Sequence, residues 1–131
     1  MLKSAGCPLC EVKQERILHR SQLAIALMDA FPVSEGHCLI IPCRHVGSWF
    51  DTTPEERRDM IRLLDEARNA IKQRHDPAAF NIGINDGTAA GQTVPHLHVH
   101  LIPRYAGDAA DPRGGVRWVL PERADYWSSR K

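Results

Sequence analysis

The chain has 131 residues, of which 25% are charged and 43% hydrophobic, as in ordinary globular proteins. Its 17 basic and 16 acidic residues leave a net charge of +1. No segment gathers lysine and arginine into the basic stripe that binding to a nucleic-acid backbone requires, so we expect a folded protein whose main partner is not nucleic acid.

No segment predicts a membrane span or secretion. The longest apolar stretches, Leu23 to Met28 and Cys38 to Pro42, are much shorter than the roughly 18 residues of a transmembrane helix. The first four residues, Met1 to Ser4, do not begin an apolar leader. We therefore expect a cytoplasmic protein, whose cysteines at positions 7, 10, 38 and 43 are thiols or metal ligands rather than disulfides.

The N-terminal part of the sequence predicts short elements separated by turns. We expect a short helix over 11–15 and strands over 17–20, 23–28 and 37–42. Proline and glycine break the pattern between the second and third strands, so 29–36 is predicted to be a loop.

A long helix is predicted to begin at Thr53-Pro54-Glu55-Glu56. This segment has a threonine N-cap, a proline at the first helical position and a glutamate that can close a capping box. Apolar residues recur every three or four positions from there to Ile71. The helix is expected to end near His75, because the following Asp76-Pro77 disfavours helical backbone.

Two further strands are predicted, over 80–85 and 96–102, with a glycine-bearing loop between them and Pro103 ending the second. The tail over 106–131 lacks periodicity and is expected to be extended and packed on the rest of the chain. No repeat or linker divides the sequence. We therefore expect one α+β domain over 1–131, with an antiparallel sheet of about five strands, one long helix and one short helix.

The segment from His96 to Ile102 alternates histidine and apolar residues. In a strand, this places His96, His98 and His100 on one face, with neighbouring Cα atoms roughly 6.6–6.8 Å apart, so one ion cannot bind all three. The spacing leaves two interpretations: a His-x-His metal pair, or a nucleophilic middle imidazole whose neighbours fix its tautomer. The preceding segment over 85–93, rich in glycine and threonine, favours the second, because its backbone N–H groups can bind phosphate.

Here the sequence resembles the histidine triad (HIT) family, whose signature is matched at every position from His96 to Ile102. Residues 36–46 are similar to the family's preceding strand and 91–95 to its phosphate loop, and the matched segments together span most of 7–105. The resemblance implies a nucleotide-binding HIT fold, with the sheet continued across a homodimer. It also implies that His98 attacks the α-phosphorus and forms a nucleotidyl-histidine, which water or another acceptor resolves.

The resemblance also implies supporting roles for other residues. His100 and His37 are expected near His98, where they donate to phosphate oxygens or to the leaving group. The residues expected to contact the nucleotide are Asp29 at the ribose, Asn85, Gln92, Thr93 and His100. The residues themselves leave plainer alternatives open: a loop cap for Asp29, a turn residue for Asn85 and a hydrogen-bonded strand histidine for His37.

Cys7-Pro8-Leu9-Cys10 has the spacing of a zinc knuckle, which needs two more ligands. The resemblance implies that His45 and His96 complete the site, which leaves His98 free and ties the N-terminus to the histidine strand. A redox or merely buried cysteine pair is the alternative, although the pair does not lie between a strand and a long helix as in thioredoxins. The other two cysteines are expected to be small buried residues.

Pro103-Arg104 follows the triad, as it does in the family's hydrolase-like members, and favours hydrolysis of diadenosine polyphosphates or similar nucleotides. Phosphoramidate hydrolysis and nucleotidyl transfer share the first half-reaction and stay open. A non-enzymatic nucleotide sensor is disfavoured, because a sensor needs no nucleophile. In the tail, Arg113, Arg117 and Trp118 are either phosphate and base contacts or residues of a packed surface, and the sequence does not decide between these.

Overall fold

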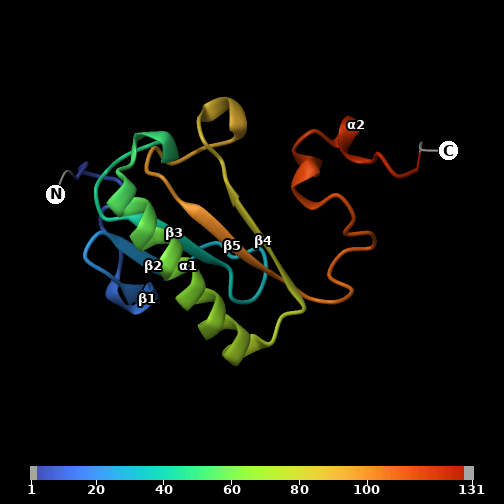
Figure 1. Cartoon of the computed structure of the whole chain (residues 1–131), viewed down its shortest axis with the longest axis horizontal. Coiled ribbons are helices and arrows are strands. Elements are labelled where there is room, and N and C mark those ends of the chain that lie inside the picture. The colour runs from blue at the N-terminus through green and yellow to red at the C-terminus, as the bar shows by residue number, and fades with distance from the viewer. Residues whose placement is uncertain (1–2, 129–131) are drawn as a thin grey trace.

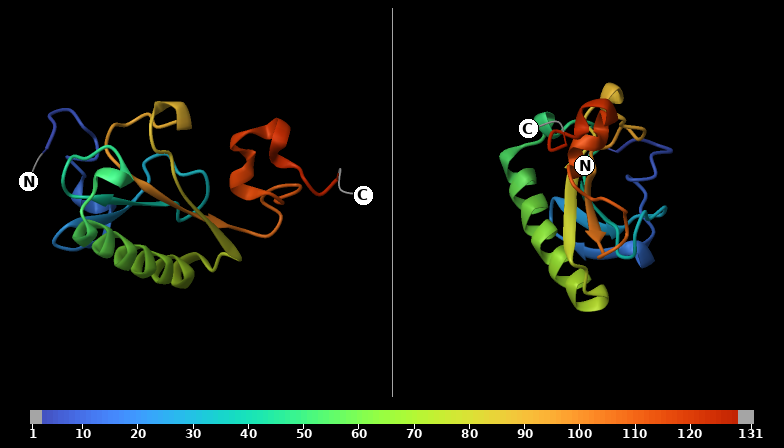
Figure 2. Two further views of the ribbon diagram at one scale, coloured as in Figure 1. Left: turned by 45° about the horizontal axis from the view of Figure 1, so that its top comes forward. Right: turned by 90° about the vertical axis from the view of Figure 1, so that its right-hand side faces the viewer.

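A computed structural model describes residues 3–128, in which five antiparallel strands form one sheet with the order β1-β2-β3-β5-β4 (Figure 1). This confirms the predicted α+β class. The strands are β1 (Ile17–Arg20), β2 (Ala24–Met28), β3 (Cys38–Pro42), β4 (Ala79–Ile84) and β5 (Val99–Arg104). The long helix α1 (Pro54–His75) lies along one face of this sheet (Figure 2).

Strands β2 and β3 are buried on both faces, because the sheet has a hydrophobic cluster on each side. On the α1 side, small and branched residues of these strands pack against the apolar stripe of the helix, which is Met60, Leu63, Ala67 and Ile71. On the opposite side, a second cluster joins the strands to the N-terminal segment through Cys7, Leu9, Ile25, Leu27, Leu39 and Ile41. The continuous apolar runs in the sequence follow from this double burial.

Helix α1 begins and ends where the sequence predicts. The Thr53 hydroxyl accepts a hydrogen bond from the Glu56 backbone N–H (3.1 Å), and the Thr53 N–H donates to the Glu56 carboxylate (2.9 Å), which completes a capping box. Glu56 is also buried in an ion pair with Arg44 (2.8 Å). The start of the helix is thereby fixed to the segment that follows β3 and carries His45.

The strand predicted over 96–102 is wrong at both ends. His96 lies in a bend before β5, and the strand continues through Pro103 to Arg104. Proline is tolerated there because β3 pairs only with Val99–Leu101, so Pro103 has a strand neighbour on the β4 side alone. Its carbonyl accepts a hydrogen bond from the Ser34 hydroxyl (2.7 Å) on the side away from β4.

Gly36 shows why the loop before β3 needs glycine. Its φ is +88°, and a Cβ atom there would lie 2.9 Å from Cγ2 of Ile71 on α1. Both the left-handed backbone and the close approach exclude larger residues. This contact sets the path by which the chain enters β3 and positions the adjacent His37.

The short helices differ from the prediction. A 3-10 turn, η1 (Gln14–Arg16), replaces the helix expected over 11–15, and hydrogen-bonded turns at Cys7 and Cys10 precede it. Two more 3-10 turns, η2 (Trp49–Asp51) and η3 (Thr88–Ala90), lie in loops.

The tail is not extended as predicted. It forms η4 (Gly115–Val119) and α2 (Pro121–Ala124), which pack on each other, and η4 also contacts β4 beyond the edge of the sheet (Figure 1). Between residues 3 and 128, no helix is long and apolar enough to cross a membrane.

Candidate active site and metal centre

The candidate site lies on the face of the sheet opposite α1. Along β5, Val99, Leu101 and Pro103 are buried and alternate with half-buried residues on the other face. That other face carries His100 and, two residues before it, His98, whose ring centroid lies 5.2 Å from that of His100. One face of β5 therefore packs in the core, and the opposite face presents its side chains to the candidate site.

The neighbouring strand brings His37 to the same place. Leu39 pairs with His100 in the β3–β5 ladder, and Nε2 of the buried His37 lies 2.9 Å from Nδ1 of His100. The structure thus brings together the three histidines for which the sequence predicted catalytic roles, His37, His98 and His100.

The hydrogen bonds of His98 define its tautomer. Its Nδ1 lies 2.8 Å from the backbone carbonyl oxygen of His96. A carbonyl only accepts, so Nδ1 carries the proton and the lone pair of the neutral ring is on Nε2. The backbone of His96 therefore orients the His98 ring and leaves Nε2 with the lone pair.

His37 and His100 form a directed pair. The Val33 backbone N–H donates to Nδ1 of His37 (3.1 Å), so the proton of His37 is on Nε2 and is shared with Nδ1 of His100. The proton of His100 is then on Nε2, where it can be donated to a ligand. Burial lowers the pKa of His37, which Asp29 raises in part, and burial also lowers the pKa of His100, with His98 and His37 adding to the decrease. Both rings are therefore neutral near pH 7.

Asp29 lies at the end of β2, beside this pair. Its Oδ2 atom is 3.3 Å from Nε2 of His37, while Oδ1 accepts the backbone N–H of Phe31 (2.8 Å). The structure therefore shows the loop-capping contact that the sequence left open, and it also places the second carboxylate oxygen at the histidines. Sequence reasoning missed Arg16, whose guanidinium donates to the carbonyl of Met28 (3.0 and 3.1 Å) next to Asp29.

A cavity of about 210 Å³ opens beside His98 and Asp29. Its walls are mainly apolar and come from the Cys-x-x-Cys segment, β3 and the loop before the triad. The residues that line it include Leu9, Arg16, Asp29, Leu39, Thr93 and His98. Such a cavity, with an apolar wall and a carboxylate at its edge, has the chemistry that a nucleoside needs.

The side chain of Gln92 is used to fix the loop that precedes the triad. The side-chain amide donates to the carbonyls of Gly47 (3.0 Å) and Val94 (3.1 Å), and its oxygen accepts the N–H of Gly87 (2.8 Å). The structure therefore uses Gln92 to fix the loop, whereas Thr93 lines the cavity. Asn85 is exposed and follows β4 directly, and because Ile84 pairs with Val99, it comes next to His98 across the ladder.

Four potential metal ligands meet behind His98, with their ligand atoms all within 4.8 Å of one another: Cys7, Cys10, His45 and His96. Nδ1 of His96 is 3.5 Å from the sulfur atoms of both cysteines, and Nδ1 of His45 is 3.3 Å from that of Cys10. In tetrahedral zinc sites, bond lengths of about 2.3 Å to sulfur and 2.0–2.1 Å to nitrogen separate the two atom types by about 3.6 Å. The observed separations fit this geometry.

The outer hydrogen bond of His96 also suits a metal ligand. Its Nε2 atom lies 2.9 Å from the carbonyl oxygen of Pro42, so Nε2 carries the proton and Nδ1 presents its lone pair to the cysteines. His96 is fully buried. The same residue therefore faces the cysteines through its ring and orients His98 through its carbonyl.

The tail residues do not reach this site. The Arg117 guanidinium donates to the carbonyls of Ala124 (2.8 Å) and Arg123 (2.9 Å), and Arg113 pairs with Asp111 (2.9 Å). The two arginines are thus used within the tail. Trp118 donates from Nε1 to the carbonyl of Arg113 (2.7 Å) and leaves part of its ring exposed.

Comparison with known proteins agrees with this architecture. The family model described as HIT domain matches residues 11–107, and the chain belongs to this family. It is 40% identical over 96 residues to a bis(5'-nucleosyl)-tetraphosphatase [asymmetrical] from Schizosaccharomyces pombe, covering 73% of this chain and 53% of that protein. It is also 36% identical over 94 residues to an AP-4-A phosphorylase from Mycobacterium tuberculosis, covering 71% and 48%.

A solved structure of a Zn-bound histidine triad family protein from Mycobacterium smegmatis has a TM-score of 0.70 and 33% identity, covering 81% of this chain and 80% of that one. The chain spans about half the length of the two curated relatives.

Proposed function

We propose that the chain is an enzyme that hydrolyses diadenosine polyphosphates or similar nucleotides at the α-phosphorus, through a covalent nucleotidyl intermediate on His98. The observation that carries this proposal is the hydrogen bond from Nδ1 of His98 to the carbonyl of His96 (2.8 Å), which leaves the lone pair on Nε2 beside a cavity that Asp29 also lines. The activities named for two relatives, a nucleosyl tetraphosphatase and a phosphorylase, support the substrate class.

In the first step, Nε2 of His98 attacks the α-phosphorus, and the bond from phosphorus to the bridging oxygen of the leaving polyphosphate breaks. The ring becomes positively charged, and its Nδ1–H donates to the carbonyl of His96, which stabilises this charge. The Nε2–H of His100 donates to the phosphate or to the leaving oxygen. Water then attacks the same phosphorus, the P–N bond breaks, one proton of the water is released, and neutral His98 is restored.

The remaining polar residues position the nucleotide. Asp29 accepts hydrogen bonds from the ribose hydroxyls, as a carboxylate can. We assign the phosphate contacts to Thr93, which lines the cavity, and to Asn85, which is across the ladder from His98. Gln92 acts through the loop that it holds rather than by direct contact.

We further propose that Cys7, Cys10, His45 and His96 bind one structural zinc ion. The ion would supply cross-links among three separate segments and no chemistry at the phosphate, because all four protein ligands close its coordination shell. The name of the Mycobacterium smegmatis protein, which is Zn-bound, supports this proposal.

The nucleophile that resolves the intermediate distinguishes the two activities named for the relatives. We expect diadenosine tetraphosphate to give ATP and AMP when water attacks the adenylyl group. Attack by inorganic phosphate would give ATP and ADP instead. Chromatography of the products with and without phosphate tests the proposal: ATP with AMP in both samples supports hydrolysis, ADP that depends on phosphate would assign the chain as a phosphorylase, and no products would reject both.

We also propose that β4 pairs with β4 of a second copy to form a homodimer with a continuous sheet. β4 is an edge strand, and the exposed Ile82 (51%) and Ile61 (53%) border an apolar groove of about 290 Å³ between β4 and α1. An unpaired, apolar edge strand favours pairing with an identical one about a two-fold axis.

Replacing Ile82 with lysine is expected to convert the dimer to a monomer, because each charge would lie buried in the pairing edge. Light scattering after size exclusion measures the mass. Val119→Lys, at a more exposed valine (77%) of the tail, is the control for an added surface lysine and should remain dimeric. A monomeric parent, or a dimeric Ile82→Lys variant, would show that this edge is not the interface.

A further inference from the structure

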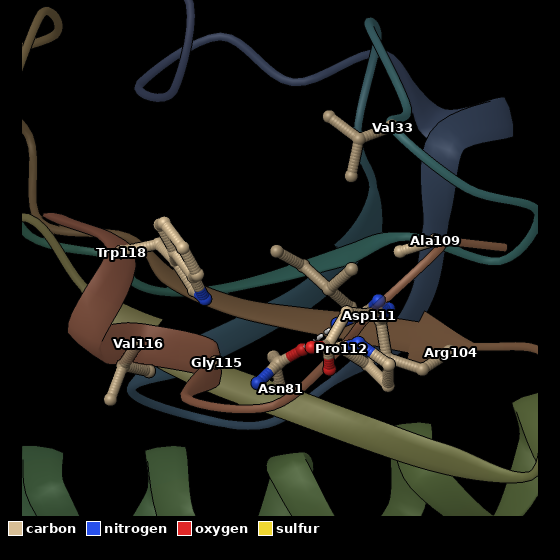
Figure 3. Close-up of a pocket in the computed structure, with 10 residues that line it drawn as sticks. Val33, Asn81, Arg104, Ala109, Asp111, Pro112, Gly115, Val116 and Trp118 are labelled. Carbon is tan, nitrogen blue, oxygen red and sulfur yellow. Dashed lines mark hydrogen bonds between the residues drawn. The ribbon is translucent and has the colours of Figure 1, made fainter. Parts of the chain in front are cut away.

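A larger cavity, a groove of about 500 Å³, lies between the tail and the β4–β5 end of the sheet (Figure 3). It is separate from the apolar groove between β4 and α1. Its floor is formed by Asn81, Ile102 and Arg104, and its far wall by η4 and the segment before it. In Figure 3, the Trp118 ring projects from η4 on one side, and Val33 hangs from the loop over 29–36 above the floor. The site described above uses none of these side chains.

The floor of this groove continues the histidine face. Ile102 and Arg104 follow His98 and His100 at intervals of two residues along β5, so their side chains lie on the same face, about 6.7 Å apart in succession. The 29–36 loop borders both cavities, through Asp29 in the smaller one and Val33 in the groove. The smaller cavity reaches His98 directly, and the groove begins at Ile102, next to His100.

This placement fits the geometry of phosphoryl transfer. The attacking and leaving atoms lie roughly in line on opposite sides of the phosphorus. When the attacked nucleotide has its nucleoside in the cavity beside Asp29, the leaving polyphosphate extends away from His98 on another path. The groove past His100 is a built cavity along such a path, and His100 is the residue with a free N–H to donate.

The walls of the groove suit a nucleoside better than a bare phosphate. Trp118 is 45% exposed, and its ring is held by the bond from Nε1 to the Arg113 carbonyl, so its aromatic surface is fixed in place. Val33, Val116 and Ile102 make the rest of the surface apolar. Arg104 is already neutralised by Asp108 (2.9 Å) and bonded to Asn81 (2.6 Å), so it supplies polar contact without excess positive charge.

We propose that this groove binds the second nucleoside of a dinucleoside polyphosphate, with its base stacked on Trp118. Any purine or pyrimidine has a face that can stack on an indole, which makes such a contact tolerant of base identity. The groove would thereby distinguish dinucleoside substrates from mononucleotides with small leaving groups. This inference rests on the proposed nucleotide hydrolase function.

The test compares two substrates that share the attacked nucleotide: diadenosine tetraphosphate and adenosine 5'-phosphoramidate, which has no second nucleoside. Trp118→Ala is expected to lower kcat/KM for the dinucleotide about tenfold, mainly through KM, because one base stack is lost. The kcat/KM for the phosphoramidate should stay within about twofold. Trp118→Phe keeps an aromatic face and should restore most of the dinucleotide activity.

Val119→Ala is the matched control, because Val119 belongs to the same 3-10 turn, is 77% exposed and does not line the groove. If Trp118→Ala lowers kcat/KM equally for both substrates, or for neither, the groove is not the second nucleoside site. If the parent protein cleaves neither substrate, the proposed function itself fails. If the parent cleaves the dinucleotide but Trp118→Ala leaves the ratio of kcat/KM for the two substrates unchanged, the hydrolase proposal survives and the subsite is rejected.

Discussion

Replacing His98 with asparagine is expected to lower kcat for nucleotide hydrolysis at least about a thousandfold, because the covalent route loses its nucleophile. Asparagine is the suitable substitute, since its side-chain amide can still donate to the carbonyl of His96, which Nδ1 of His98 contacts at 2.8 Å. Nucleotide affinity should stay within about tenfold of the parent value, because Asp29 and the apolar cavity wall are unchanged. Rapid-quench kinetics gives kcat, and calorimetry with a nucleoside monophosphate gives Kd.

His19→Asn provides the control for histidine loss in general. His19 lies on β1, where its side chain is 37% exposed and 3.9 Å from Glu66, and it has no contact with the candidate site. This variant should have parent kinetics. A His98→Asn variant that turns over at the parent rate would remove His98 from the mechanism, and the neutral histidine pair of His37 and His100 would need another role.

Loss of one proposed zinc ligand is the second large effect that we expect. Cys10→Ser should lower the melting temperature by about 10 °C or more, because a tightly bound ligand of the native state contributes several kcal/mol to stability. Its sulfur contacts both His45 (3.3 Å) and His96 (3.5 Å), so this single change removes the ligand that is adjacent to both histidine ligands. Calorimetry measures the transition, and elemental analysis should find about one zinc per parent chain.

Cys43→Ser is the matched control, because Cys43 is also half-buried and lies outside the ligand group. It should retain zinc and shift the transition only slightly. A chelator should destabilise the parent and leave Cys10→Ser unchanged. Parent protein that contains no zinc after growth with zinc, or that melts at the same temperature with and without it, would contradict the metal proposal.

The proposed zinc site also contacts the surroundings of His98. The ring of His96 faces the cysteines, and its carbonyl accepts a hydrogen bond from Nδ1–H of His98. Leu9, between the two cysteines, lines the cavity beside His98. The metal-free Cys10→Ser variant should therefore bind nucleotide more weakly as well as melt earlier.

Most of the fold follows from local patterns. The capping box at Thr53 and the three-to-four spacing up to Ile71 locate α1, and the apolar runs locate β2 and β3, because both faces of those strands are buried. The ends of the last strand do not follow from the sequence, because alternation indicates which face a side chain occupies, whereas the ends of a strand depend on its partners. Both β3 and β4 pair with β5 from Val99 onward, and the pairing with β4 extends as far as Arg104.

The site could be predicted only where its chemistry is local in the sequence. The triad is a contiguous motif, so the resemblance identifies His98 and His100. The hydrogen bond from Gln92 to the Gly47 carbonyl spans 45 residues, and nothing near Gln92 indicates it. The groove against Trp118 likewise depends on how the tail folds against β4, which an aperiodic sequence does not specify.

Mass spectrometry of the protein quenched shortly after mixing with diadenosine tetraphosphate tests directly whether His98 forms a covalent intermediate. We predict an adenylyl group on the peptide that contains His98, formed as fast as the first ATP is released and absent from His98→Asn. Such an adduct is acid-labile, so the quench and digestion should be alkaline. Formation of ATP and AMP without a competent adduct on His98, or with the adenylyl group on another residue, would contradict the covalent mechanism.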